Sequence, residues 1–263
     1  MRQDSYRVAA LQLDCSGTVH KVEERAISMI REAARRKAQI ACLPEHWIPG
    51  RHPNIEDEVG LFAEVAREAD ISVVLGADFG LRSDRVTVES VVIGPKGVTG
   101  RQQKTHLFGR EKRSAAAGND YTVFDVGGLK VGIAICHDLV YPEVARILTL
   151  KGAEVIFAPA KIVAAGSEPW ELYVKARALE NRVPVVSPNC VDPPRFRGQS
   201  LVVGLSASED GIVYPRPVTK AGPEPAVLLA DLDLSGMKSF RRHRLEARRT
   251  ETYADLVRLQ PSL

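Results

Sequence analysis

Short apolar runs alternate with helical periodicity in the first quarter of the chain. Residues 6–13 are almost continuously apolar, which is typical of a strand that is buried on both faces. Apolar residues then recur at helical spacing over residues 22–33. Residues 39–43 form a second apolar run, and Asn54 is suited to cap another amphipathic helix. This strand–helix–strand–helix order predicts an α/β fold.

After residue 70 the pattern changes to closely spaced strands. Turn residues separate these strands. Gly94-Pro95-Lys96-Gly97 indicates one hairpin, and Gly127-Gly128 indicates another. Antiparallel pairs are therefore expected in the sheet. The polar residues 105–120 lie between the two hairpins, and a loop of this length in a compact domain is usually functional. Strands are predicted at residues 71–79, 86–93, 98–103, 121–126 and 129–135.

The second half of the chain returns to α/β alternation. Pro142 suits the first turn of a helix, and residues 170–182 show a second helical pattern. The proline-rich residues 215–225 are predicted to form a surface loop, and the chain becomes polar and basic after Asp233. No repeat or linker divides the sequence, so one domain over residues 1–263 is predicted. Further strands are predicted at residues 155–158, 183–187, 201–205, 211–214 and 227–232.

Composition changes this picture mainly by excluding classes of protein. The chain has 263 residues, of which 44% are hydrophobic, and this is ample for a large core. Its net charge of +3 is too small to indicate a nucleic-acid or membrane partner. No apolar run reaches membrane-spanning length, and no signal peptide is expected before the first strand. The four cysteines lie far apart, which argues against a zinc knuckle or a redox dithiol, and the expected location is the reducing cytoplasm.

Three polar residues, Glu45, Lys104 and Cys136, each follow a different buried run. In open α/β sheets the ends of the strands converge on the crevice that carries the chemistry. A carboxylate can take the proton of a thiol, and a lysine ammonium or a backbone N–H can stabilise a developing oxyanion. Such a trio would attack a carbonyl or nitrile carbon and form a thioester. Its base would be a carboxylate, unlike the histidine of papain-like enzymes.

Each of these residues also has a plainer interpretation. Buried strand cysteines are mostly small hydrophobes, Glu45 could cap a turn, and a lysine at a strand end is more often solvated. Glu111 could belong to a surface charge cluster. The basic residues 241–249 could bind nucleic acid, but acidic neighbours favour a solvated or subunit-facing segment. The possible metal ligands show no recognisable spacing: Cys136, His46, His106 and His137.

Several motifs occur in a specific order along nearly the whole chain. The series begins at Val8-Ala9-Ala10-Leu11-Gln12 and ends around Asp231-Leu232-Asp233. Each motif alone is weak, but their occurrence together in this order is specific. Between these ends stand Leu43-Pro44-Glu45, Lys104-Thr105-His106-Leu107-Phe108 and Ile135-Cys136-His137-Asp138 with Tyr141-Pro142-Glu143. In this combination the chain resembles the nitrilase superfamily of carbon–nitrogen hydrolases.

The resemblance implies roles for the residues at the strand ends. Glu45 would be the general base, Lys104 the oxyanion stabiliser and Cys136 the nucleophile. The backbone N–H of His137 would be a second oxyanion donor. Neither a metal nor an organic cofactor is implied. We therefore expect hydrolysis of a small amide or N-carbamoyl compound through a cysteine thioester, with a nitrilase, or a catalytically silent binding protein on the same fold, as alternatives.

The resemblance also points to a second glutamate, and the chain departs from the family pattern nearby. Glu111 stands seven residues before Gly118 and matches a family glutamate that would orient Lys104 and the substrate amide. The position after the cysteine is often tyrosine or tryptophan in relatives, whereas here it is His137. An aromatic residue usual between the second glutamate and the glycine is replaced within residues 114–117. These departures lie close to the substrate pocket.

The resemblance further implies an architecture and an assembly. The expected fold is a four-layer α-β-β-α sandwich with two mixed β-sheets. Relatives form homodimers or larger homo-oligomers through helix faces and C-terminal segments. Residues 234–263 are therefore expected to lie at a subunit interface of a single carbon–nitrogen hydrolase domain.

Overall fold

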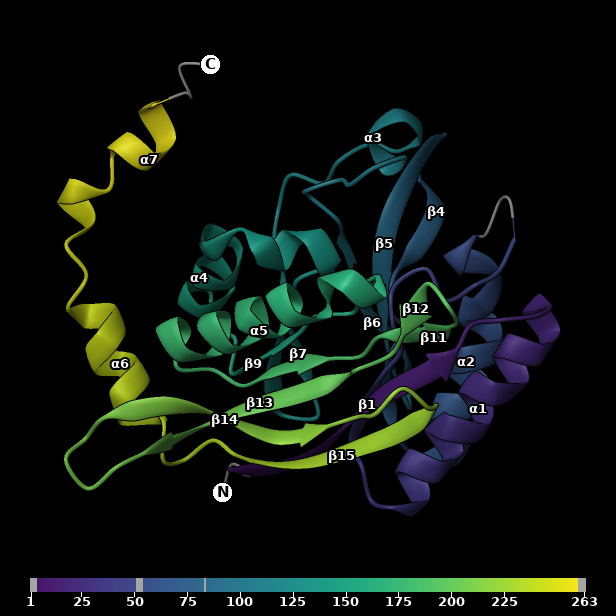
Figure 1. The fold of residues 1–263 in the computed structure, drawn as a ribbon, viewed down its shortest axis with the longest axis horizontal. Coiled ribbons are helices and arrows are strands. Elements are labelled where there is room, and N and C mark those ends of the chain that lie inside the picture. Colours follow the sequence, from purple (N-terminus) through teal and green to yellow (C-terminus); the bar gives the residue numbers. More distant parts are fainter. Residues whose placement is uncertain (1–3, 51–53, 83, 260–263) are drawn as a thin grey trace.

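Two β-sheets form the centre of the computed structural model, which describes residues 4–50, 54–82 and 84–259 (Figure 1). The larger sheet has the order β12-β11-β1-β2-β3-β5-β4, with β15 paired to β1 and β6 paired to β5. It is mixed, because β1, β2 and β3 are parallel whereas β3, β4 and β6 each pair antiparallel with β5. Its strands are β1 (Ser5–Asp14), β2 (Ile40–Cys42), β3 (Ser72–Val74), β4 (Asp78–Arg82), β5 (Arg85–Gly94), β6 (Gly97–Gln103), β11 (Cys190–Asp192), β12 (Phe196–Arg197) and β15 (Ala226–Asp233).

The smaller sheet has the order β14-β13-β10-β9-β8-β7 and is also mixed. Strands β8, β9 and β10 are parallel, whereas β7, β13 and β14 pair antiparallel with their neighbours. Its strands are β7 (Val123–Val126), β8 (Leu129–Ile133), β9 (Val155–Phe157), β10 (Val185–Ser187), β13 (Leu201–Ala207) and β14 (Val213–Lys220).

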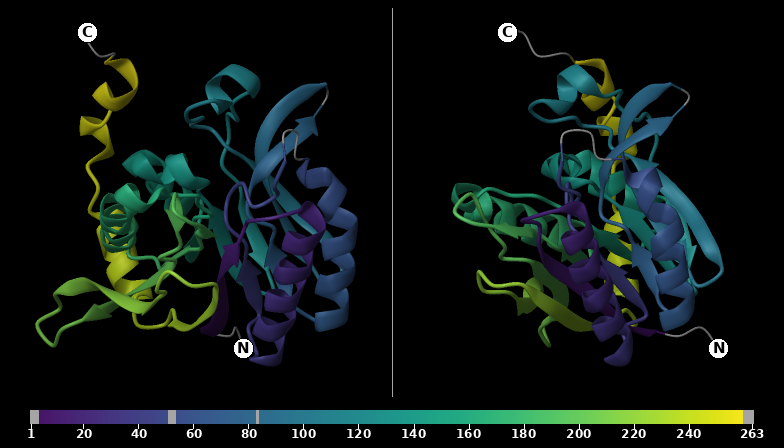
Figure 2. Two further views of the ribbon diagram at one scale, coloured as in Figure 1. Left: turned by 45° about the vertical axis from the view of Figure 1, so that its right-hand side comes forward. Right: turned by 90° about the vertical axis from the view of Figure 1, so that its right-hand side faces the viewer.

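Helices cover the outer face of each sheet, as the two views in Figure 2 show. The larger sheet is covered by α1 (Val19–Arg35) and α2 (Ile55–Ala69), and the smaller sheet by α4 (Pro142–Leu150) and α5 (Ser167–Asn181). The predicted cap is confirmed, because the Asn54 side chain accepts a hydrogen bond from the N–H of Glu56 at the start of α2. The four-layer α-β-β-α sandwich with two mixed sheets is therefore confirmed.

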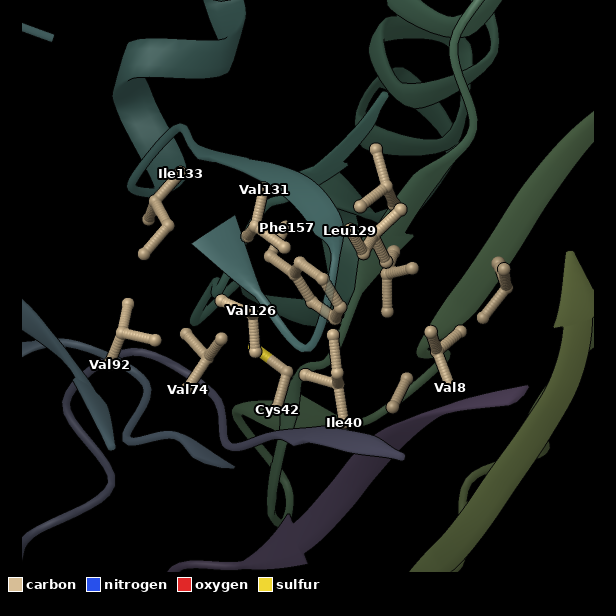
Figure 3. Packing of buried hydrophobic residues seen from close by; sticks show 14 of the residues in the cluster. Val8, Ile40, Cys42, Val74, Val92, Val126, Leu129, Val131, Ile133 and Phe157 are labelled. Carbon is tan, nitrogen blue, oxygen red and sulfur yellow. The ribbon is translucent and has the colours of Figure 1, made fainter. Parts of the chain in front are cut away.

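Three apolar layers hold the sandwich together, and they follow from the two-residue period of a strand. In β1, Val8 and Ala10 point into the space between the sheets, whereas Ala9 and Leu11 pack under the helices. A strand between two apolar layers is buried on both faces, which explains the continuous apolar run of residues 6–13. Figure 3 shows the central layer, in which Val8 and Ile40 of the larger sheet pack near Leu129 and Phe157 of the smaller sheet.

The predicted strand over residues 71–79 is interrupted and forms two strands, β3 and β4. Gly76 lies between them with a φ of +63°, and a Cβ atom there would meet the carbonyl oxygen of Pro44 at 1.9 Å. Only glycine allows this close approach. The contact holds the segment after β3 against the segment after β2, where Glu45 pairs with Ala77 in an isolated bridge.

The prediction of a surface loop over residues 215–225 is wrong for its first half. Strand β14 continues to Lys220 despite Pro215 and Pro217. It is an edge strand that pairs only with β13 within its sheet, so the missing proline N–H groups remove few ladder hydrogen bonds. The short strands β11 and β12 were not predicted, because two or three residues carry no readable period.

The C-terminal segment leaves the sandwich beside α5 (Figure 1). It contains α6 (Lys238–Glu246), the 3₁₀ turn η3 (Thr250–Thr252) and α7 (Asp255–Arg258). No residue of α6 is buried, although Arg241 donates a hydrogen bond to the carbonyl oxygen of Ala153. Among the described residues, no helix is both long enough and apolar enough to span a membrane.

Candidate active site

The ends of elements from both sheets bring the four predicted side chains to one cavity. Glu45 follows β2 and Lys104 follows β6 in the larger sheet. Glu111 is the first residue of α3 (Glu111–Ser114), a single helical turn within the long polar loop. Cys136 follows β8 of the smaller sheet and begins the 3₁₀ turn η1 (Cys136–Val140). The convergence predicted from the strand ends is therefore present.

Lys104 is the centre of this group and is almost fully buried, with 1% of its surface exposed. Its Nζ donates to Glu45 Oε1 at 2.7 Å and to Glu111 Oε1 and Oε2 at 2.9 and 2.8 Å. A buried ammonium requires such compensation, since an isolated charge in an apolar environment is very unfavourable. Burial alone would lower the pKa of Lys104, but the charges of Glu45 and Glu111 outweigh it and raise that pKa above its usual value. Lys104 is thus held as a cation.

Glu111 is oriented from three sides. Besides Lys104, its Oε2 accepts the backbone N–H of Phe108 at 2.7 Å and its Oε1 lies 2.8 Å from Nε2 of His46. Burial favours the protonated carboxyl, but the hydrogen bond with His46 and the charge of Lys104 lower the pKa of Glu111 to about 2. Glu111 is only 4% exposed, so it does not belong to a surface charge cluster, which was the alternative considered from the sequence. Glu111 is therefore a fixed anion that positions Lys104.

His46 and Asp78 complete the group and were not predicted to act in this way. His46 Nδ1 lies 2.9 Å from Asp78 Oδ1, while its Nε2 faces Glu111. Both ring nitrogens must donate when both partners are carboxylates, so the ring is an imidazolium. Although burial opposes its charge, hydrogen bonds with Asp78 and Glu111 raise the pKa of His46 to about 10. The only sequence signal was the position of His46 directly after Glu45.

The backbone at Cys136 makes a sharp turn. Its φ of +44° is rare for a residue with a side chain, and such strain is concentrated at functional sites. Asp138 braces the turn, because its Oδ2 accepts the N–H of Ile135 and its Oδ1 accepts the N–H groups of Thr105 and His106. The segment after Lys104 is thereby tied to the segment that carries Cys136.

The thiol of Cys136 is protonated in this environment. Burial, followed by the negative charge of Glu45, raises the pKa of the Cys136 thiol well above its usual value. A thiolate–imidazolium pair of the papain type would require a lowered thiol pKa instead. The arrangement suits a thiol that gives up its proton during reaction to a neighbouring base.

His137 lies at the rim of the cavity. Its ring packs near Phe108, with the centroids 4.8 Å apart, and its Nε2 lies 3.4 Å from the hydroxyl of Tyr141. Partial burial and the charge of Lys104 lower the pKa of His137, so its ring is neutral at pH 7. Its backbone N–H belongs to the first turn of η1, where N–H groups have no acceptor within the helix.

The cavity that these residues line has a volume of about 630 Å³, which suits a small substrate. Its deep end contains the buried group around Lys104. Its outer walls combine aromatic and aliphatic side chains with three basic side chains. The outer lining includes Phe108, Arg110, Val140, Lys161, Ile162, Val163, Trp170, Tyr173, Arg195 and Phe196.

The site also contains three possible metal ligands, Glu45, His46 and Glu111, whose ligand atoms lie within 4.8 Å of one another. The ammonium of Lys104 already contacts both of these carboxylates and supplies the positive charge that they need. The metal alternative drawn from the sequence joined Cys136 to three histidines, of which only His46 belongs to this cluster.

Comparisons with known proteins identify a family and similar folds. A family model described as carbon–nitrogen hydrolase matches residues 7–242. A protein of Pyrococcus abyssi named nitrilase is 36% identical over 200 residues, which cover 70% of this chain and 75% of that protein. The omega-amidase NIT2 of Mus musculus is 29% identical over 259 residues, covering 90% of this chain and 92% of its own. The crystal structure of a carbon–nitrogen hydrolase from Helicobacter pylori G27 has a TM-score of 0.86 at 22% identity, over 97% of this chain and 99% of that one.

Proposed function

The chain belongs to the carbon–nitrogen hydrolase family, and we propose that it hydrolyses a small carboxamide or N-carbamoyl compound through a thioester on Cys136. The observation that carries the proposal is the ammonium of Lys104, held between Glu45 and Glu111 beside a thiol that faces the cavity. The 29% identity with an omega-amidase over nearly the whole chain supports an amide as substrate. A reducing cytoplasm would keep the thiol available.

Acylation begins with proton transfer from the thiol. Lys104 occupies Oε1 of Glu45, which leaves Oε2 to take the proton of Cys136, and Glu45 and Cys136 line the same cavity. The sulfur attacks the carbonyl carbon, and the Lys104 ammonium and the N–H of His137 stabilise the oxyanion. Glu45 returns the proton to the leaving nitrogen, which departs as ammonia. The acyl group remains on Cys136 as a thioester.

Deacylation uses the same residues, with a water molecule as the nucleophile and the sulfur of Cys136 as the leaving group. Glu45 takes a proton from a water molecule, whose oxygen attacks the thioester carbon. Lys104 and the His137 N–H again stabilise the oxyanion. The C–S bond then breaks, the sulfur regains a proton from Glu45, and the carboxylic acid leaves. Glu111 takes no proton in this scheme, because its low pKa makes it a weak base.

Nitrile hydrolysis is the second candidate, favoured by the 36% identity with a protein named nitrilase. A thiolate adds to a nitrile carbon as it adds to a carbonyl, so the same residues serve. A panel of simple amides, ω-amides, N-carbamoyl compounds and nitriles, assayed for ammonia and for the carboxylic acid, separates the two. Activity confined to nitriles would replace the amidase proposal, and no ammonia from any member would contradict both.

Replacing Lys104 by alanine is expected to lower kcat by at least about a hundredfold, the scale seen when one oxyanion donor is lost. It also leaves Glu45 and Glu111 buried without a cation, which costs about 3–5 kcal/mol of folding free energy. Thermal unfolding and steady-state kinetics measure the two effects. Lys112→Ala is the matched control, because this exposed lysine lies outside the cavity lining. An effect of Lys104→Ala on KM alone would mean that Lys104 only binds substrate.

The protein is also expected to form a homodimer or a larger homo-oligomer that involves residues 234–263. The segment from α6 to α7 projects from the sandwich (Figure 1), and about 70% of the surface of Leu256 and of Leu259 is exposed. Apolar side chains on a projecting segment are typical of an interface. Light scattering at micromolar concentration should report a multiple of 28.8 kDa, and a 28.8 kDa particle would contradict the expectation.

A further inference from the structure

The ammonium of Lys104 has as many carboxylate acceptors among the described residues as it has N–H bonds. An ammonium has three donors, and the acceptors are Glu45 Oε1 at 2.7 Å, Glu111 Oε2 at 2.8 Å and Glu111 Oε1 at 2.9 Å. The proposed reaction needs one of these N–H groups for the oxyanion. One carboxylate oxygen must then be released as the oxyanion forms, and the release is costly unless another donor stays on that oxygen.

Glu111 Oε1 is the oxygen that Lys104 can release most easily. It makes the longest of the three contacts, and it has a second donor, because Nε2 of His46 lies 2.8 Å away. Oε2 keeps the backbone N–H of Phe108 at 2.7 Å. With His46 in place, both oxygens of Glu111 stay hydrogen-bonded when one N–H of Lys104 turns to the oxyanion. Without His46, the release would leave a buried carboxylate oxygen unpaired.

Asp78 makes His46 a donor at both of its ring nitrogens. Its carboxylate is fully buried, and its two oxygens accept the N–H groups of Phe79 at 2.9 Å and Ile48 at 3.2 Å. Hydrogen bonds of this kind favour the ionised carboxyl. Oδ1 of Asp78 also lies 2.9 Å from Nδ1 of His46. The ring of His46 therefore stands between two carboxylates, which require a proton on each nitrogen.

We propose that His46 is a positioning residue, which allows Lys104 to transfer one N–H from Glu111 to the oxyanion. The inference rests on the proposed hydrolase function and adds His46 and Asp78 to the residues that support it. His46 acts through Glu111 and Lys104, so its contribution belongs to the transition state rather than to substrate binding. Its backbone is also held in place, because the ammonium of Lys161 donates to the carbonyl oxygen of His46 at 2.7 Å.

Removal of the ring tests this role. His46 has a φ of +45°, which glycine adopts readily, so His46→Gly does not strain the backbone. We expect kcat for the best amide of the substrate panel to fall about 10- to 100-fold, the scale of a misplaced catalytic group, while KM changes much less. Steady-state ammonia assays measure both constants, and circular dichroism checks the fold.

An added ring should restore the lost activity, because His46 lines the cavity and its removal leaves a space that opens to it. Imidazole is partly protonated at pH 7 and can donate from both nitrogens. It should recover most of the lost kcat, whereas pyrazole, a ring of the same shape that stays neutral, should not. His20→Ala is the matched control, since the side chain of His20 is 80% exposed on α1. This variant should keep kcat and respond to neither compound.

Three results would overturn the role of His46 and leave the hydrolase function standing. They are an unchanged kcat in folded His46→Gly, a loss confined to KM, and rescue that does not distinguish imidazole from pyrazole. Absence of ammonia release by the wild-type protein would instead count against the proposed function.

The protons on the ring give a readout that does not require turnover. Nitrogen-15 NMR of the wild-type protein, labelled at histidine, should show a proton on both ring nitrogens of His46 at pH 7.5. His46→Asn assigns the signals, because asparagine also tolerates a positive φ. This variant repeats the kinetic test if His46→Gly does not fold, and its neutral amide should give the same loss of kcat. A His46 ring with one unprotonated nitrogen would contradict the proposal.

Discussion

Cys136→Ala is expected to abolish ammonia release while leaving the fold intact. The side chain is small and lies where the cavity meets two of the apolar layers, so its replacement by alanine removes a single sulfur atom. Loss of a nucleophile that acts with a base and an oxyanion site lowers kcat on the order of 10⁴- to 10⁶-fold. Steady-state ammonia assays and circular dichroism measure activity and fold in the same preparation.

Chemical labelling provides the companion measurement. Cys15, Cys42 and Cys190 are buried, whereas Cys136 is partly exposed to the cavity. Iodoacetamide should therefore modify Cys136 first, and peptide mass spectrometry should show loss of activity in proportion to that modification. Cys42→Ala is the matched control and should keep turnover. Full activity in Cys136→Ala, or inactivation that follows another cysteine, would exclude the thioester mechanism.

Glu45→Gln is expected to lower kcat by up to about 10⁴-fold, the upper range for general acid–base catalysis. The substitution keeps the shape and the hydrogen bond to Lys104 but removes the group that accepts protons. Because Glu45 serves both the thiol and the water, acylation and deacylation should both fail. Rapid-mixing experiments should then show no burst of ammonia.

His137→Ala is the contrasting variant. The imidazole of His137 packs near Phe108 and Tyr141 at the rim, and its lowered pKa leaves it neutral. We expect this variant to retain most of kcat and to change mainly the preference among substrates. If His137→Ala is inactive while Glu45→Gln still turns over, histidine is the base and the scheme proposed for Glu45 is wrong.

Local sequence patterns determined the architecture of this protein to a large extent. Continuous apolar runs in β1 and β8 indicate strands buried on both faces, and such strands require a further layer on each side. Helical periodicity and the Asn54 cap located α2. Glu45, Lys104 and Cys136 were identified as candidates from their strand ends and from the family motifs, because both are readable over a few consecutive residues. Glu111 was identified from the family resemblance alone.

Tertiary structure alone decided what surrounds these four residues. His46, Asp78 and Glu111 are separated by more than 30 residues from one another, so no periodicity connects them. The positive φ of His46 lets its ring and the side chain of Glu45 reach the same buried cluster.

The sequence also gave no sign that two cations, Lys161 and Arg195, contact the ring of Phe196. Lys161 follows β9 of the smaller sheet and Arg195 precedes β12 of the larger sheet, yet both contact the ring of Phe196. A sequence encodes which face of a strand is buried through its local period, but the polar contacts of a site depend on which distant loops the fold places together. The charged lining of the cavity is therefore a property of this protein that only the folded chain shows.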